Sequence, residues 1–170
     1  MALVVSPEYG YCIAIAVATG FHYTMQTVGV AKARYSAMSR EYFEKHFAAE
    51  NEAHKKEFGK PIAVGGHPDN GLGRLSSKLD FISWIKLQNA QRVHLNYLEG
   101  LTPAIANLLL AGLFYPITSA SLGVLNLVGR QLYASGYRAK GPDGRLYGFL
   151  LINIAQVSFT GMGIFGGRFV

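Results

Sequence analysis

Residues 89–99 read Asn-Ala-Gln-Arg-Val-His-Leu-Asn-Tyr-Leu-Glu, and they lead into a long stretch of chain without charge. No Asp, Glu, Lys or Arg occurs from Gly100 to Gly129. In a helix, which advances about 100° per residue, Arg92, Asn96 and Glu99 fall within about 60° of one another. Charged groups on one helical face beside hydrocarbon are costly, so these residues are candidates for a functional site.

The charges of the chain are segregated. Eleven of the 16 Lys and Arg residues and eight of the 10 acidic residues lie between Lys32 and Glu99. The remaining chain forms apolar windows that, at about 1.5 Å per residue, are long enough to cross a hydrocarbon core of roughly 30 Å. The pattern predicts an all-α integral membrane four-helix bundle in one domain, residues 1–170. The expected helices cover about residues 8–34, 80–114, 117–138 and 146–167.

The connection at about residues 38–78 is expected to be a cytosolic loop. Between Arg40 and Phe58, the pairs Glu41/Lys45 and Glu52/Lys56 have the four-residue spacing of a solvated, exposed helix. The positive-inside rule places this basic connection and the short basic turn at residues 138–145 in the cytosol.

Several function classes are excluded by composition and spacing. The net charge of +6 suggests nucleic acid, but no basic amphipathic stripe with stacking aromatics is present, so no nucleic-acid partner is expected. The five His residues and the single Cys12 lack the spacing of metal ligands, and no metal is expected. No Ser-His-Asp or Cys-His arrangement is suggested.

A second polar stripe follows the first. Four side chains spaced four, three and four residues apart again fall within about 60° on a helical wheel: Asn126, Arg130, Tyr133 and Tyr137. Either Glu99 neutralises one of the arginines as structural packing, or the surplus of positive charge serves an anionic ligand. A ligand with carboxylates, an amine and amides would use Arg, Glu and Asn side chains together.

Residues 89–99, with Gly129-Arg-Gln-Leu-Tyr-Ala-Ser-Gly-Tyr137, resemble the MAPEG family, the membrane-associated glutathione and eicosanoid enzymes. The resemblance implies a four-helix protomer, a homotrimer in the endoplasmic reticulum (microsomal) membrane, and a glutathione site between subunits that faces the cytosol. Carried over by matching position, the residues divide between two subunits. One subunit would contribute Arg92, Asn96 and Glu99, and the next Arg130, Tyr133 and Tyr137, with Arg34 nearby.

The family's thiolate-stabilising arginine matches Arg145, although Arg138 could substitute because the turn before Arg145 is long and contains Pro142. We therefore expect a glutathione S-transferase, with possible peroxidase activity, that uses the thiolate to attack a lipophilic electrophile or lipid hydroperoxide from the bilayer. Two alternatives stay open: a non-catalytic lipid-binding scaffold of the same fold, and a leukotriene C4 synthase-like conjugating enzyme. Gly100 stands where some relatives carry an aromatic, which weakens the second alternative.

Overall fold

The computed structural model describes residues 5–167, so both ends of the predicted domain, residues 1–170, extend past the described part. Every regular element among the described residues is helical: α1 (Tyr9–Ala37), α2 (Arg40–His46), α3 (Ala48–Phe58), the 3₁₀ turn η1 (Arg74–Ser76), α4 (Phe81–Gly112), α5 (Pro116–Lys140), η2 (Gly141–Arg145) and α6 (Leu146–Gly166). The expected all-α class is confirmed.

The chain divides into two compact units, and α1 and α4 each contribute to both. The first unit contains the described residues up to Met25 and those from Val93 onward; the second contains Gln26–Arg92. Each unit has its own apolar core. We describe the two units separately below.

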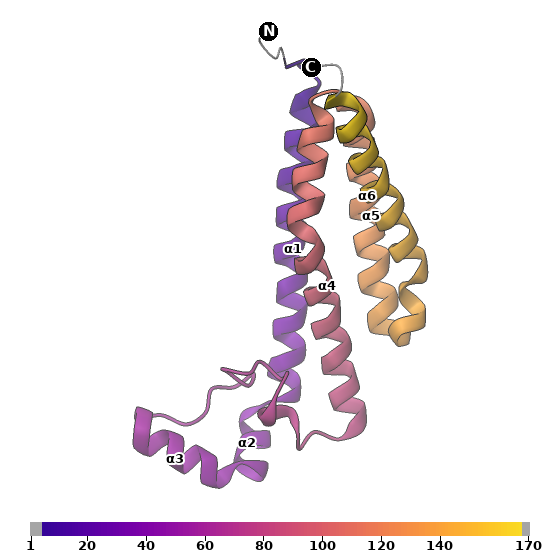
Figure 1. The fold of residues 1–170 in the computed structure, drawn as a ribbon. Coiled ribbons are helices and arrows are strands. Elements are labelled where there is room, and N and C mark those ends of the chain that lie inside the picture. The colour runs from indigo at the N-terminus through magenta and orange to yellow at the C-terminus, as the bar shows by residue number, and fades with distance from the viewer. Residues whose placement is uncertain (1–4, 168–170) are drawn as a thin grey trace. The chain divides into compact units, whose positions relative to one another are not determined.

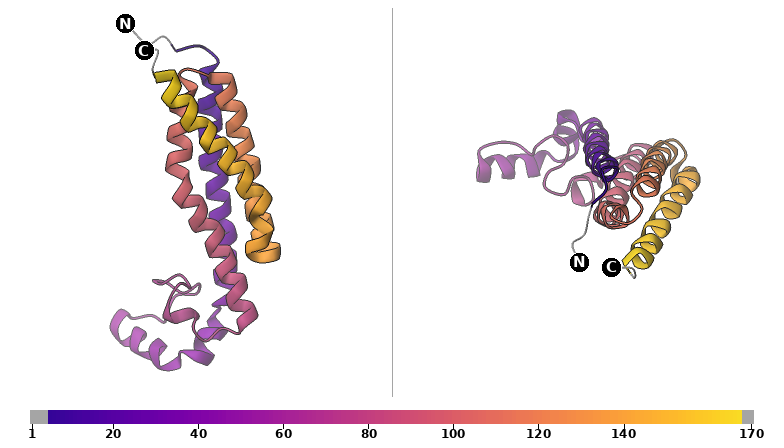
Figure 2. Two further views of the ribbon diagram at one scale, coloured as in Figure 1. Left: turned by 45° about the vertical axis from the view of Figure 1, so that its right-hand side comes forward. Right: turned by 90° about the horizontal axis from the view of Figure 1, so that it is seen from above.

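The first unit contains parts of the four long helices. Figures 1 and 2 show α5 and α6 as neighbouring antiparallel helices joined by η2. One core cluster takes residues from all four: Cys12 of α1, Leu108 and Ala111 of α4, Ala120 of α5, and Ala155 and Phe159 of α6. Burial of these side chains is what holds the ends of the helices in register.

Glycines bring α5 and α6 into backbone contact. A Cβ at Gly136 would lie 2.0 Å from the carbonyl oxygen of Gly144, and one at Gly148 would lie 2.2 Å from the backbone nitrogen of Tyr133. Small residues allow this close approach between helices in apolar surroundings. The turn between the helices begins at Gly141, whose φ of 68° favours glycine.

Local signals in the sequence account for the helix ends. The carboxylate of Asp80 accepts a hydrogen bond from the backbone N–H of Ser83 at 3.0 Å, so Asp80 caps the start of α4. The Ser83 hydrogen bonds to the Asp80 carboxylate hold the pKa of that group below its usual value. Pro116 begins α5 at a position where its missing N–H costs no helical hydrogen bond.

The second unit corrects the expectation of one exposed helix over residues 40–58. The chain forms two helices there, and Phe47 separates α2 from α3. Phe43 and Phe47 are buried together with Met38, Ile62 and Leu87 in a second core cluster. Two aromatic residues four positions apart provide an apolar face that the charge spacing alone did not reveal. Glu52 forms its ion pair with Lys55 at 2.6 Å, not with Lys56.

The loop after α3 is held by side-chain to backbone hydrogen bonds. The Asp69 carboxylate accepts from the backbone N–H groups of Gly71 and Leu75, both at 2.8 Å. The Tyr42 hydroxyl donates to the carbonyl of Leu75 at 2.8 Å, and burial raises the pKa of Tyr42. The segment is therefore a small folded body and not an open loop.

One helical stretch among the described residues is long and apolar enough to cross a membrane. It runs from Pro116 to Gly166 and includes α5, η2 and α6. The apolar runs of α1 and α4 are interrupted by polar side chains such as His22, Gln26 and Glu99. The prediction of four membrane-spanning helices therefore stays a prediction.

The helix contact at Gly148 can be tested by mutation. Gly148→Ala forces a methyl group against the backbone of α5, and overpacking of this kind costs about 1–3 kcal/mol. Gly161→Ala is the matched control on the same helix, because no heavy atom lies within 4 Å of its added Cβ. We expect a lower melting temperature in detergent for Gly148→Ala alone. Equal melting temperatures for the two variants would contradict the close contact.

The second core can be tested in the same way. Phe43 is 0% exposed, and Phe→Ala in a core typically costs about 3–5 kcal/mol. Phe43→Ala should accelerate amide hydrogen exchange within residues 40–62, whereas Phe58→Ala, at a side chain that is 65% exposed, should leave it unchanged. If both variants exchange like the wild type, α2 does not pack as described.

Candidate functional site

A pocket of about 340 Å³ lies among α4, α5 and α6 of the first unit. It contains two polar residues of the first sequence stripe, the buried arginine of the second, and side chains of α6. Its lining consists of Asn96, Glu99, Gly100, Pro103, Arg130, Phe149, Ile152, Asn153 and Gln156. The structure thus brings together Asn96, Glu99 and Arg130, which the sequence had assigned to one site.

Arg130 is the central cation of this pocket. Its side chain is only 5% exposed, and its Nη1 donates to the backbone oxygen of Asn96 at 3.2 Å and to the Asn96 Oδ1 at 3.1 Å. Its Nε is buried without a hydrogen-bond partner, and within residues 5–167 Arg130 forms no ion pair. A buried cation without a counter-charge is costly, and an anionic ligand would relieve that cost.

The face of the Tyr97 ring contacts the Arg130 guanidinium. The Arg130 Cζ lies 4.7 Å from the centroid of the Tyr97 ring, which is a cation–π contact. The Tyr97 hydroxyl lies 3.0 Å from the His22 Nδ1, and the His22 Nε2 lies 3.0 Å from the Gln131 Oε1. A polar chain therefore runs from α1 through Tyr97 to the pocket.

Gly100 leaves the space that Arg130 uses. A Cβ at position 100 would lie 2.1 Å from the Arg130 Nη2. A side chain at this position would have to displace the guanidinium, so the glycine and the observed arginine conformation depend on each other. Pro103, one turn further along α4, also lines the pocket.

The remaining residues of the second stripe lie in the core. The predicted shared face of α5 is confirmed, because Asn126, Arg130, Tyr133 and Tyr137 are all buried. Tyr133 and Tyr137 lie with ring centroids 5.6 Å apart and do not line the pocket. Among the described residues, the Asn126 Nδ2 and the Tyr133 hydroxyl have no hydrogen-bond partner. They are further buried donors without acceptors on the face that carries Arg130.

Arg145 lies in η2 beside a second hollow of about 340 Å³, lined by Pro142, Asp143, Arg145, Leu146 and Phe149. Its guanidinium carbon lies 5.8 Å from the centroid of the Tyr137 ring. Phe149 lines both hollows, so they adjoin at this side chain. Arg145 is half-buried, whereas Arg138 is exposed.

A comparison with known protein families decides the membership of the chain. The model of the MAPEG family matches residues 12–165, which is nearly the whole sequence. The protein belongs to the MAPEG family. The resemblance seen in the sequence is thereby confirmed at the level of the family. MAPEG proteins are membrane proteins with glutathione-related transferase or synthase-type functions.

The expected division of the MAPEG site between subunits stays a prediction. Arg130 was assigned to the subunit next to the one that supplies Asn96. In the structure, Arg130 hydrogen-bonds Asn96 of the same chain. These hydrogen bonds connect α4 and α5 within the first unit of one protomer.

Two arginines of the predicted site belong to the second unit. The Arg34 Nε donates to the carbonyl of Gly65 at 2.9 Å, and its Nη2 lies 2.9 Å from the His67 Nε2. Arg92, an exposed residue of α4, is the last residue of this unit. A role for either in ligand binding stays a prediction.

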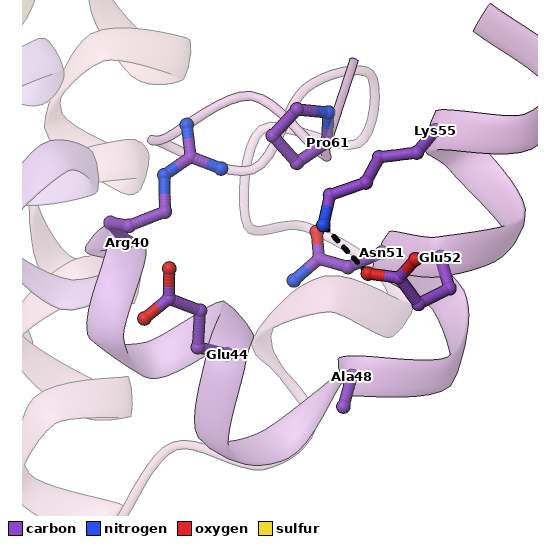
Figure 3. A pocket seen from close by; sticks show the side chains of 7 residues that line it. All are labelled: Arg40, Glu44, Ala48, Asn51, Glu52, Lys55 and Pro61. Carbon is purple, nitrogen blue, oxygen red and sulfur yellow. Dashed lines mark hydrogen bonds and ion pairs between the residues drawn. The ribbon is translucent and has the colours of Figure 1, made fainter. Parts of the chain in front are cut away.

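The second unit has a hollow of its own, of about 320 Å³ (Figure 3). Its labelled side chains come from α2, α3 and the chain after them, and include Arg40, Glu44, Glu52 and Lys55. Two cations and two carboxylates line it, and the Glu52–Lys55 ion pair lies at its edge. Because its charges are balanced, this hollow is a weaker candidate for an anion site than the pocket at Arg130.

Within residues 5–167, no group of three or more His, Cys, Asp or Glu side chains is placed to hold a metal ion.

The sequence analysis did not identify four residues of the MAPEG pocket and its support: His22, Tyr97, Asn153 and Gln156. His22 was set aside because no Cys or acidic residue stands at metal-ligand spacing from it, and only the fold brings it beside Tyr97 and Gln131. Asn153 and Gln156 carried a usable signal, since two amides three residues apart share one face of an otherwise apolar helix.

Proposed function

We propose that this protein is a membrane-bound glutathione S-transferase with glutathione-dependent peroxidase activity. The observation that carries the proposal is the buried Arg130 cation, which forms no ion pair within residues 5–167 and shares a pocket with Asn96 and Glu99. Glutathione offers two carboxylates, one ammonium group and two amides. Arg130 suits a carboxylate, Glu99 the ammonium group and Asn96 an amide.

The other matched residues complete the proposed glutathione site. The Tyr133 hydroxyl is a buried donor without an acceptor among the described residues, and we propose that it donates to an oxygen of the ligand. The face of the Tyr137 ring contacts the Arg145 guanidinium. A glutathione-binding role of Arg34 and Arg92 is also proposed, on the resemblance to the family alone. In the sequence, Glu8-Tyr-Gly-Tyr and Val30-Ala-Lys-Ala-Arg34 resemble the microsomal glutathione S-transferase 3 branch, and this supports the choice of a transferase.

Arg145 is proposed as the residue that stabilises the glutathione thiolate, with Arg138 as the alternative. A free thiol with a pKa of about 8.5 is only a few per cent ionised at neutral pH. Lowering that pKa by about two units requires roughly 2.7 kcal/mol, which suits a cation in a partly desolvated hollow. The half-buried position of Arg145 beside the apolar Phe149 supports this choice over the exposed Arg138.

The thiolate would react with substrates that enter from the bilayer. With an electrophile, the sulfur forms a thioether bond, either by displacing a leaving group from carbon or by adding to an activated carbon–carbon double bond whose carbanion then takes a proton. With a lipid hydroperoxide, the sulfur attacks the terminal oxygen and the O–O bond breaks. The lipid alkoxide takes a proton and leaves as the alcohol, and the glutathione sulfenic acid then condenses with a second glutathione to give the disulfide and water.

The membrane arrangement is part of the proposal. The four long helices contain 29, 32, 25 and 21 residues, each enough at about 1.5 Å per residue to span roughly 30 Å. We infer a homotrimer in the endoplasmic reticulum membrane with its glutathione site toward the cytosol. The basic residues of the second unit and of η2 support that orientation.

Arg145→Ala tests the thiolate assignment. We expect kcat to fall at least about 50-fold, while the dissociation constant of glutathione changes less than about threefold. The reason is that Arg145 contacts only the thiolate, whereas other residues bind the rest of glutathione. The ultraviolet absorbance of the bound thiolate should disappear at neutral pH. Arg138→Ala is the matched control and should retain the thiolate signal. Loss of the thiolate signal in Arg138→Ala but not in Arg145→Ala would assign the role to Arg138. Equal losses of glutathione binding and turnover in Arg145→Ala would reject the role of Arg145.

Tyr97 offers a test of the Arg130 site. Tyr97→Leu removes the ring face beneath the guanidinium, and we expect glutathione to bind about 5- to 30-fold more weakly, since a desolvated cation–π contact contributes about 1–2 kcal/mol. Tyr97→Phe keeps the ring and loses only the hydroxyl that faces His22, so its effect should be under about fivefold. Isothermal titration calorimetry in detergent measures both. Equal weakening by the two variants would show that the ring face does not hold Arg130.

A further inference from the structure

The α6 wall of the pocket carries two amides in an otherwise apolar helix. Asn153 and Gln156 both line the pocket, flanked by Phe149 and Ile152 of the same helix. Residues Leu146–Gly166 contain no charged side chain and form part of the stretch that is apolar enough to cross a membrane. Polar groups at such positions are costly unless they serve a ligand path or a partner.

The hydrogen bonds of these amides leave a specific set of groups available. The Asn153 Nδ2 donates to the carbonyl of Phe149 at 2.7 Å, so its Oδ1 remains as an acceptor. The Gln156 side chain has no hydrogen-bond partner within residues 5–167, so it offers both a donor and an acceptor. Arg130 is the third residue of the pocket with an available hydrogen-bonding group, since its buried Nε–H has no acceptor within residues 5–167.

The two walls of the pocket suit different chemistry. The α4 and α5 walls present Asn96, Glu99 and Arg130, the groups assigned above to glutathione. The α6 wall presents no charge, and its two amides lie beside Phe149 and Ile152. A mixed surface of this kind suits a hydrocarbon chain that bears one uncharged oxygen group, because the chain contacts the apolar side chains while the oxygen pairs with the amides.

The geometry points to Asn153 and Gln156 as the specificity-determining residues for the lipophilic second substrate, which they select for a hydroxyl or hydroperoxy group on its chain. This inference rests on the proposed function and names the substrate class of the same site. A hydroperoxide has one O–H donor and two acceptor oxygens, so it can donate to the Asn153 Oδ1 and accept from the Gln156 Nε2.

The expected selectivity follows from the cost of unpaired amides. A pocket built to hydrogen-bond a hydroxyl group discriminates against the analogue that lacks it, because its own polar groups are then left unsatisfied. Asn153 is exposed and Gln156 is half-buried in the protomer. The preference for a hydroxylated substrate is therefore expected to be well below the value that a fully closed site reaches. Two hydrogen bonds of ordinary strength correspond to about a 5- to 30-fold preference.

The test compares two uncharged probes, so that the carboxylate of a fatty acid does not engage Arg130. The probes are methyl hydroxyoctadecadienoate and methyl octadecadienoate, and their binding to the full-length protein in detergent is measured by calorimetry with glutathione present. The wild type should bind the hydroxylated ester about 5- to 30-fold more tightly. The double variant Asn153→Leu, Gln156→Leu should bind the two esters equally.

Thr160→Val is the matched control, because it removes a hydroxyl from the same helix at a position outside the pocket lining. It should keep the preference of the wild type. Gln156→Leu provides a second measurement if the double variant does not fold, since it removes the Gln156 Nε2 donor and should lower the preference for the hydroxylated ester.

The outcomes separate this inference from the proposed function. If the wild type binds glutathione but shows no preference between the esters, or if the preference is unchanged in the double variant or in Gln156→Leu, the role of the α6 amides is overturned and the transferase proposal stands. If the wild type does not bind glutathione, the proposed function fails. A preference that persists without glutathione and disappears in the double variant would still support the α6 wall as the recognition surface.

Discussion

The pocket of this MAPEG protein depends on how one buried guanidinium is held. Within residues 5–167 Arg130 forms no ion pair, and its side chain contacts the Asn96 oxygens and the Tyr97 ring. Neutral acceptors and a ring face orient the cation without cancelling its charge. A salt bridge at this place would remove the charge that an incoming anion needs. The site is therefore charged and oriented before any ligand arrives.

The support for Arg130 extends across three helices of the first unit. His22 of α1 contacts Tyr97 of α4, and Gln131 of α5 contacts the other nitrogen of the same imidazole. The Tyr97 hydroxyl also lies 3.3 Å from the carbonyl oxygen of Thr19, so the polar groups around the ring bond to one another. Gly100 has no side chain and so leaves room for the Arg130 guanidinium. The polar residues of the bundle thus form one connected arrangement.

Parts of this arrangement were predictable from sequence, and the reasons are local. The segregation of charge and the apolar windows predicted an all-helical protein, and the spacing of Asn126, Arg130, Tyr133 and Tyr137 predicted their shared face, because both depend only on helical periodicity. Contacts between helices are different. His22 and Tyr97 are far apart in the sequence, and the break at Phe47 reflects burial of aromatic side chains against remote residues. The charge pairs around that position could not reveal it.

The glycine contacts between α5 and α6 have a consequence for how such a pocket diversifies. Because backbone meets backbone at Gly136 and Gly148, the separation of these helices is independent of the side chains at positions 153 and 156. Exchange of those two amides would alter the chemistry of one wall and leave the frame unchanged. The hairpin of α5 and α6 would thus keep its geometry while the residues at positions 153 and 156 vary. One or two substitutions there would then be enough to change the preference for a lipid substrate.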